Sequence, residues 1–212
     1  MYRFIVVTLI SALTACGSSM DYSHSPNFNS NLNRFQHPDG DPSNKKPSEL
    51  FAMIREFSKR KYDQYEQIGF PVKLSERHEL STFSESVMWI GQSTILLNHK
   101  GLTVLTDPQF SNRASPLFFG GPKRVTPIPF NIKDLPNIDV VLISHNHYDH
   151  LDRSSIRDLI KHQPSIKFLV PLGLGQTLYK WGVVDVTELD WWQAINLQDV
   201  EIQPTPVKHW SS

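Results

Sequence analysis

Short apolar runs separated by turn residues form the pattern of the chain from residue 86 onward. Residues 87–90, 94–97 and 102–105 are each rich in β-branched or large apolar side chains, which predicts three successive strands. The stretch Asn-His-Lys-Gly at residues 98–101 predicts the turn between the last two of them. This part of the chain is therefore expected to be a run of strands joined by tight turns.

A longer apolar run at residues 139–143 predicts a buried strand. After a polar stretch, Ile156, Leu159 and Ile160 fall at helical spacing, and Asp152 is placed to act as the N-cap of that helix.

A second strand and helix follow the same order. Residues 166–170 predict another strand, and a turn containing glycine then leads into a short helix that ends near Tyr179. No Gly-rich nucleotide-binding motif follows any of these strands.

The amino-terminal end has the pattern of an export signal. Arg3 precedes an apolar stretch, residues 4–13, that is too short to cross a membrane as a helix. The sequence Leu-Thr-Ala-Cys at residues 13–16 resembles the bacterial lipobox, in which Cys16 would carry the lipid, whereas an ordinary signal peptide with an incidental cysteine is the alternative. Gly17 after the cysteine favours the outer membrane, so we expect a cell-envelope lipoprotein facing the periplasm or the outer surface.

The remaining amino-terminal residues divide into two segments. Residues 17–47 are rich in Ser, Asn, Pro, Asp and Gly, which predicts a flexible tether. Residues 48–80 are expected to form a helical extension, with an amphipathic helix from about residue 48 to residue 67. This helix either packs on the following domain, residues 81–212, or lies on anionic lipid through its basic face.

Two further sets of residues have open interpretations. Residues 110–130 contain several Gly and Pro residues and predict a long loop, in which Lys123 and Arg124 are either a solvated pair or a contact for phosphate. Trp191 and Trp192 are expected to fill the core rather than to line a pocket.

The strongest chemical signal lies directly after the strand at residues 139–143. In an extended chain His145 and His147 project to the same side and can bind one cation, and Asp149 and His150 can face a second cation beside it. Imidazole and carboxylate ligands together suit zinc, iron or manganese. Histidines that are merely solvated in a polar loop are the alternative interpretation.

Composition excludes several classes of function. Lys plus Arg and Asp plus Glu number 21 each, so the chain lacks the overall basic charge on which nucleic-acid binding relies. Cys16 is the single cysteine, which excludes a disulfide within the chain and a cysteine-rich structural zinc site.

The stretch Ser-His-Asn-His-Tyr-Asp-His-Leu-Asp at residues 144–152 resembles the HxHxDH signature of the metallo-β-lactamase superfamily. Other phrases make the chain similar to the branch that contains N-acyl-phosphatidylethanolamine phospholipase D and bacterial outer-membrane-associated relatives. These phrases are VMWIGQST (residues 87–94), LTDP (105–108), GGPKR (120–124), VPLG (170–173), ELDWW (188–192) and PVKHWS (206–211).

The resemblance implies roles for particular residues. His145, His147 and His209 would hold one metal ion, and Asp149 and His150, the expected catalytic pair, would hold a second, with Zn²⁺ as the expected metal and Fe or Mn as alternatives.

Asp107 would sit behind the ligands and orient them; the alternative is a turn-forming aspartate before Pro108. The family more often has histidine where this chain has Gln92, which leaves the role of that side chain open.

The expected reaction is hydrolysis by a metal-activated water. The substrate class implied by the resemblance is a phosphodiester, including lipid phosphodiesters, with a lactone-like phosphorylated sugar as the alternative.

The resemblance also implies an α/β fold, the αββα sandwich of the metallo-β-lactamases. Because the sequence ends at Ser212, we expect only the N-terminal portion of that sandwich, without the family's bridging aspartate and last histidine. The expected consequences are an impaired hydrolase or an inactive remnant that binds one metal ion or none, and an apolar sheet face that promotes association.

Overall fold

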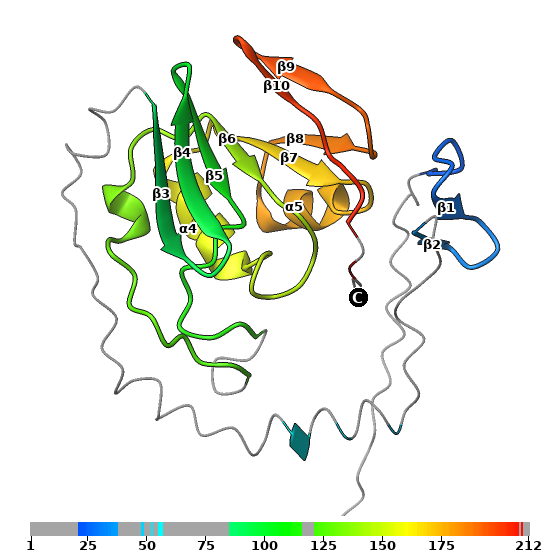
Figure 1. Ribbon diagram of the computed structural model, residues 1–212, viewed down its shortest axis with the longest axis horizontal. Coiled ribbons are helices and arrows are strands. Elements are labelled where there is room, and N and C mark those ends of the chain that lie inside the picture. The colour runs from blue at the N-terminus through cyan, green and yellow to red at the C-terminus, as the bar shows by residue number, and fades with distance from the viewer. Residues whose placement is uncertain are drawn as a thin grey trace, which may run out of the picture.

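The computed structural model describes residues 21–37, 85–115, 121–207 and 209, together with the helical positions Ser48, Ala52, Arg55 and Glu56. Its centre is a six-stranded sheet (Figure 1). The strands follow one another in chain order across the sheet: β3 (Ser86–Gly91), β4 (Thr94–His99), β5 (Leu102–Thr106), β6 (Val140–Leu142), β7 (Lys167–Pro171) and β8 (Asp185–Leu189).

The sheet is antiparallel at one side and parallel at the other. β3, β4 and β5 form an antiparallel meander, and β5 to β8 are parallel. The β4–β5 turn is shorter than predicted, since only Lys100 and Gly101 lie between the strands, with φ angles of 50° and 78°. Positive φ at both turn residues suits the right-handed twist of a two-residue hairpin.

Helices connect the parallel strands, as the pattern predicted. α4 (Arg153–His162) joins β6 to β7 and α5 (Gly175–Trp181) joins β7 to β8, while the short 3-10 helix η1 (Ile132–Asp134) precedes β6. The carboxylate of Asp152 accepts a hydrogen bond from the Ser154 backbone N–H at 3.2 Å, which confirms the predicted N-cap of α4. The α/β fold class is confirmed.

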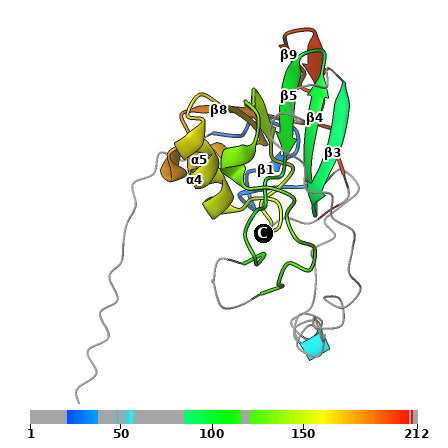
Figure 2. The same ribbon diagram turned by 90° about the vertical axis from the view of Figure 1, so that its left-hand side faces the viewer.

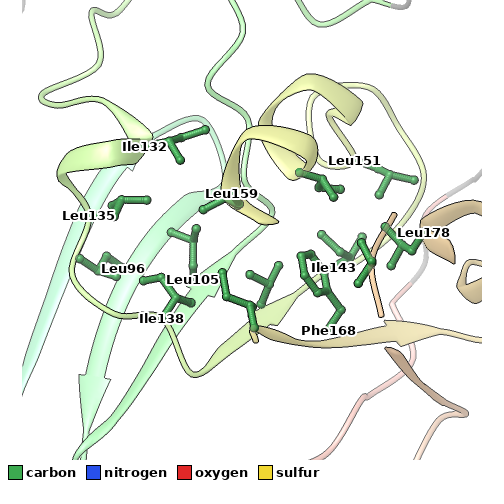
Figure 3. Packing of buried hydrophobic residues seen from close by; sticks show 14 of the residues in the cluster. Leu96, Leu105, Ile132, Leu135, Ile138, Ile143, Leu151, Leu159, Phe168 and Leu178 are labelled. Carbon is green, nitrogen blue, oxygen red and sulfur yellow. The ribbon is translucent and has the colours of Figure 1, made fainter. Parts of the chain in front are cut away.

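The helices cover one face of the sheet and complete the main hydrophobic core there. Ile156 and Leu159 of α4 and Leu178 of α5 are fully buried against Phe168 and Leu105 of the sheet. Figure 3 shows these layers facing one another, and Figure 2 shows α4 and α5 together on one side of the strands.

The opposite face of the sheet has a thinner cover. There the hairpin of β9 (Ile195–Leu197) and β10 (Val200–Ile202) packs against Leu169 and Val140. On β3 the same face is open, because Val87 is 72% exposed and Trp89 is 59% exposed. The apolar face expected to be uncovered is thus covered by β9 and β10 over part of its area and exposed at the β3 edge.

The segment predicted to be a tether contains a part that packs on the domain. β1 (Phe28–Asn29) and β2 (Arg34–Phe35) form a small antiparallel pair. Tyr22 donates a hydrogen bond to Glu188 at 3.1 Å, and Asn27 donates one to Asp190 at 3.2 Å. Residues 21–37 therefore differ from a flexible tether, because side chains from β8 and the residue after it bind them.

Several other sequence predictions have a structural outcome or fall outside the described residues. Trp192 is 63% exposed, so its prediction as core was wrong, whereas Trp191 is half-buried. The signal peptide, Cys16 and most of the helix predicted at residues 48–67 lie outside the described residues. Within the described part of the chain, no helix combines the length and apolar character needed to span a bilayer.

Candidate metal centre

The histidine-rich loop leaves the sheet at the carboxyl end of a central parallel strand. The backbone N–H of Ile143, just past β6, donates to the Leu169 carbonyl at 3.0 Å, and the N–H of Asp107, just past β5, donates to the Leu142 carbonyl at 2.8 Å. Adjacent parallel strands thus end together, and the residues that follow them meet at one edge of the sheet. Binding sites of open α/β sheets lie at this edge.

Three imidazoles converge there, and they come from distant parts of the chain. Nε2 of His145 lies 2.9 Å from Nδ1 of His147, and Nε2 of His209 lies 3.2 Å from the same atom. One ligand atom from each ring can be chosen so that all lie within 4.8 Å of one another. His209 arrives from the segment that follows β10, so the structure brings together the three residues predicted to share an ion.

The donor set fits a divalent metal. Zinc–nitrogen bonds of about 2.0–2.1 Å in a tetrahedral site separate two nitrogens by about 3.3 Å, close to the spacings found here. Ligating imidazoles must be neutral. Burial, followed by the neighbouring His150, His147 and His209 rings, lowers the pKa of His145 to about 4. Burial and then His209 also lower the pKa of His147, so both rings favour the neutral form.

Asp107 is a turn residue whose carboxylate contacts Ser144 and His150, and its role in orienting metal ligands stays a prediction. It has a φ of 37°, and its carbonyl accepts a hydrogen bond from the buried Thr94 hydroxyl at 2.7 Å. Its carboxylate accepts from the Ser144 N–H and hydroxyl, each at 2.7 Å, and lies 2.8 Å from Nδ1 of His150. The β5 and β6 ends are thereby joined beneath the histidines.

The charge of Asp107 also affects His150. Burial alone would lower the pKa of His150, but the hydrogen bond and charge of Asp107, together with the charge of Asp149, outweigh it and raise that pKa. The Ser144 hydroxyl additionally lies 2.9 Å from Nδ1 of His145. Sequence reasoning missed Ser144, whose signal was its position between a buried strand and the first histidine.

The pair predicted for a second ion lies beside the first group. The His145 and His150 ring centroids are 4.1 Å apart, and Nε2 of His150 lies 3.5 Å from Oδ2 of Asp149. Asp149 also accepts a hydrogen bond from the side-chain amide of Gln92 at 2.8 Å. Occupancy of this second position by a metal ion stays a prediction.

Arg124 does not fit the first of the two interpretations of Lys123 and Arg124, that of a solvated pair. Its guanidinium is half-buried and donates to the backbone carbonyl and side chain of Gln109 and to the Ser111 carbonyl. Burial lowers its pKa, against the opposing charge of Asp152. The difference arises because Nε and Nη2 of Arg124 donate to Gln109 and Ser111, while Lys123 remains exposed.

The chain is similar in sequence to known proteins over more than half of its length. The chain is 44% identical over 128 residues to an uncharacterized protein of Mycobacterium tuberculosis, an alignment that covers 59% of this chain and 34% of the relative. It is 37% identical over 130 residues to N-acyl-phosphatidylethanolamine-hydrolyzing phospholipase D 1 of Caenorhabditis elegans, covering 57% of this chain and 36% of that protein. The chain thus spans about a third of the length of these relatives.

One solved structure that matches part of the chain is a possible metal-dependent hydrolase from Veillonella parvula. The match has 22% sequence identity and a TM-score of 0.47, and it covers 57% of this chain and 47% of that one. The family model described as the beta-lactamase superfamily domain matches residues 103–212, just over half of the chain and all of the histidine-rich site. The chain therefore belongs to the beta-lactamase superfamily.

Proposed function

We propose that this chain carries metal-binding machinery for hydrolysis of a phosphodiester, with a phospholipid as the substrate class. The observation that carries the proposal is the convergence of the His145, His147 and His209 nitrogens at the carboxyl edge of the sheet. The similarity to a phospholipase D that hydrolyses N-acyl-phosphatidylethanolamine supports the substrate class.

The residues divide between two proposed ions. His145, His147 and His209 would hold the first, and Asp149 and His150 the second. Imidazole-rich sites suit zinc, and the added carboxylate also allows iron or manganese. When bound, such ions polarise a phosphoryl oxygen and lower the pKa of water to near neutrality.

The residues around the proposed site keep the ligand side chains neutral and oriented in the absence of a metal ion. Neutral His145 and His147 present lone pairs, because burial disfavours their protonation. Asp107 accepts from Ser144 and contacts Nδ1 of His150, which fixes the orientation of that ring. Less reorganisation is then needed when the ligands bind, so the site is largely preformed.

The test combines metal analysis with hydrolysis. We expect the purified chain to retain zinc and His147→Ala to lose it. The loss of zinc affinity should exceed the about 10–100-fold loss that is typical when a residue behind a metal ligand is removed. His162→Ala is the matched control, because His162 lies in the last turn of α4 and pairs with Asp158 at 3.5 Å. Metal content is measured by mass spectrometry.

Hydrolysis is measured on a chromogenic phosphodiester and on vesicles containing N-acyl-phosphatidylethanolamine. Turnover that depends on His147 supports the proposal. A chain that binds zinc but hydrolyses neither substrate is a binding module and contradicts the hydrolase function. Turnover of a phosphorylated lactone alone would assign the site to a lactonase.

We also propose attachment to the bacterial envelope through lipid on Cys16, supported by the lipobox-like residues 13–16. Several acyl chains anchor a protein far more firmly than one, since each buried methylene contributes about 0.8 kcal/mol. Labelled palmitate should enter the wild-type protein in a bacterial host and be absent from Cys16→Ser. Labelling of both, or of neither, would contradict the anchor.

A further inference from the structure

Gln92 reaches from the β3–β4 turn to the carboxylate proposed for the second metal position. Its side-chain Nε2 donates a hydrogen bond to Oδ2 of Asp149 at 2.8 Å, across 57 positions of the sequence. We propose that Gln92 is a positioning residue that holds Asp149 in the orientation required for the second ion. This inference rests on the proposed function, because it assigns a role within the same site.

The backbone at Gln92 has an uncommon conformation. Gln92 has a φ of 52°, in the left-handed region that glycine adopts most readily, and it follows Gly91 in the two-residue turn between β3 and β4. Residues held in such conformations are concentrated at functional sites, because the surrounding structure must support them. A glutamine at this position keeps a long polar side chain that glycine would lack.

A second contact supports the turn. The indole N–H of Trp89 donates to the backbone carbonyl of Gln92 at 2.8 Å. The strand register also shifts between Trp89 and Gly91, and such β-bulges redirect the side chains that follow them. Trp89, Gln92 and Asp149 therefore form a chain of hydrogen bonds from the edge strand to the loop of the site.

Asp149 needs such a restraint more than its neighbours do. Its side chain is 35% exposed, compared with 16% for His150. His150 is held by Asp107 at 2.8 Å, whereas Asp149 contacts His150 only at 3.5 Å. An exposed carboxylate that rotates freely loses conformational entropy when it binds an ion, and an outer hydrogen bond reduces that loss before binding.

The decisive variant is Gln92→Met, which keeps the length of the side chain and removes the donor. Gln92 is exposed, so this change opens no cavity in the core. Gln198→Met is the matched control, since Gln198 is also exposed, has a φ of 51° and lies in a turn, that between β9 and β10. Gln198 lies near Gly101, at the end of β4 opposite the β3–β4 turn.

Calorimetric titration with Zn²⁺ of the metal-free chain separates the possible outcomes. We expect Gln92→Met to weaken the second equivalent about tenfold, the lower end of the effect of an outer partner, and to leave the first unchanged. Gln198→Met should bind as the parent chain does. In an Asp149→Asn background, Gln92→Met should have no further effect, because a residue that acts through Asp149 cannot act without that carboxylate.

A spectroscopic readout checks the same claim without activity. The side-chain amide resonances of Gln92 should shift when the second equivalent of Zn²⁺ binds, and those of Gln198 should not. Unchanged affinity in Gln92→Met, tighter binding, or an equal loss in the Asp149→Asn background would overturn the positioning role alone. A parent chain that binds a single ion through His147 also overturns it, together with the second ion of the proposed function, and leaves the first ion standing. A parent chain that binds none overturns both proposals.

Discussion

The two faces of the six-stranded sheet are covered to different extents. On one face, α4, α5 and η1 bury side chains such as Leu105 and Phe168 completely. On the other, the short β9–β10 hairpin packs against Leu169, while Val87 and Trp89 of β3 stay exposed. The residues of the candidate metal centre come from both the sheet and the hairpin: Asp107 follows β5, the loop with His145 and His147 follows β6, and His209 follows β10.

This difference separates what stabilises the fold from what completes the site. The helical face fixes the ends of β5 and β6, and these carry Asp107 and the loop with His145 and His147. The hairpin face contributes His209, which follows β10. We therefore expect changes on the helical face to destabilise the whole domain and changes on the hairpin face to have smaller effects.

The largest contrast is expected from one substitution made on each face. Leu105→Ala on β5 removes a fully buried side chain and should lower the free energy of unfolding by about 2–5 kcal/mol. Leu97→Ala on β4 faces the hairpin, where the side chain is half-buried, and should cost about 1 kcal/mol. Urea denaturation measures both. Equal losses would show that the hairpin face supports the fold as strongly as the helical face does.

Asp107→Asn tests the junction beneath the site. Asparagine tolerates the φ of 37°, so the turn is kept, but the charge that binds Ser144 and His150 is lost. We expect a loss of about 1–3 kcal/mol in the free energy of unfolding. The pKa of His150, which Asp107 raises, should fall, and NMR titration measures it.

The stability that the Asp107–His150 pair contributes should depend on pH, because the pKa of His150 is raised in the folded protein. A histidine whose pKa is raised in the folded state stabilises the protein below the pKa of the unfolded chain, and the contribution disappears as the pH rises through the folded value. The difference between Asp107→Asn and the parent should therefore shrink above neutral pH. A constant difference would mean that the ion pair with His150 contributes little.

Tyr22→Phe tests how firmly residues 21–37 are held against β8. The phenol donates to Glu188, whose carboxylate also accepts from the Gly173 N–H at 3.1 Å. Removing the hydroxyl should cost about 0.5–1.5 kcal/mol and speed hydrogen exchange in residues 21–37. Unchanged exchange would show that the aromatic contacts of Tyr22 with Phe28 and Phe35 are sufficient.

Alkaline pH should have the same effect on this segment. Burial, followed by the charge of Glu188, raises the pKa of Tyr22 to about 12. The contribution is complete below the unfolded pKa near 10 and is lost as the pH rises through about 12. Exchange in residues 21–37 should therefore approach that of Tyr22→Phe over this range.

Val87→Lys is expected to have the smallest effect on stability. Val87 is 72% exposed on the edge strand, so the change should stay within about 0.5 kcal/mol. A charge on an edge strand opposes pairing with another chain, so sedimentation should show less self-association. Identical sedimentation of the two proteins would exclude the exposed β3 edge as an association surface.

Local patterns predicted the elements whose apolar residues are regularly spaced. The strands β3 to β7 and helix α4 follow from such spacing, and Asp152 was identified from its place before the helix. β8 was missed because its two apolar residues, Val186 and Leu189, do not alternate with the polar ones, and β9 and β10 because each has three residues. Short strands of this kind are stabilised by their partners rather than by their own sequence.

Contacts between distant residues were beyond the sequence alone. Tyr22 and Glu188 are 166 positions apart, so no local pattern links them, and residues 21–37 resemble a linker in composition. In the site, His145 and His147 followed from spacing and His209 from family resemblance. The contact of Gln92 with Asp149 depends on the turn conformation, which the identity of residue 92 does not specify.

The position of His209 couples the proposed ion to the weaker side of the molecule. The backbone N–H of Trp192, before β9, donates to the Pro204 carbonyl, after β10, at 2.9 Å, so the strand pair continues toward the histidine. An ion held by His145, His147 and His209 would link the loop after β6 to the segment that follows this hairpin. Its binding energy would then also stabilise the packing of the hairpin on the sheet. Chelation would loosen the cover on that side first, well before the helices separate from the strands.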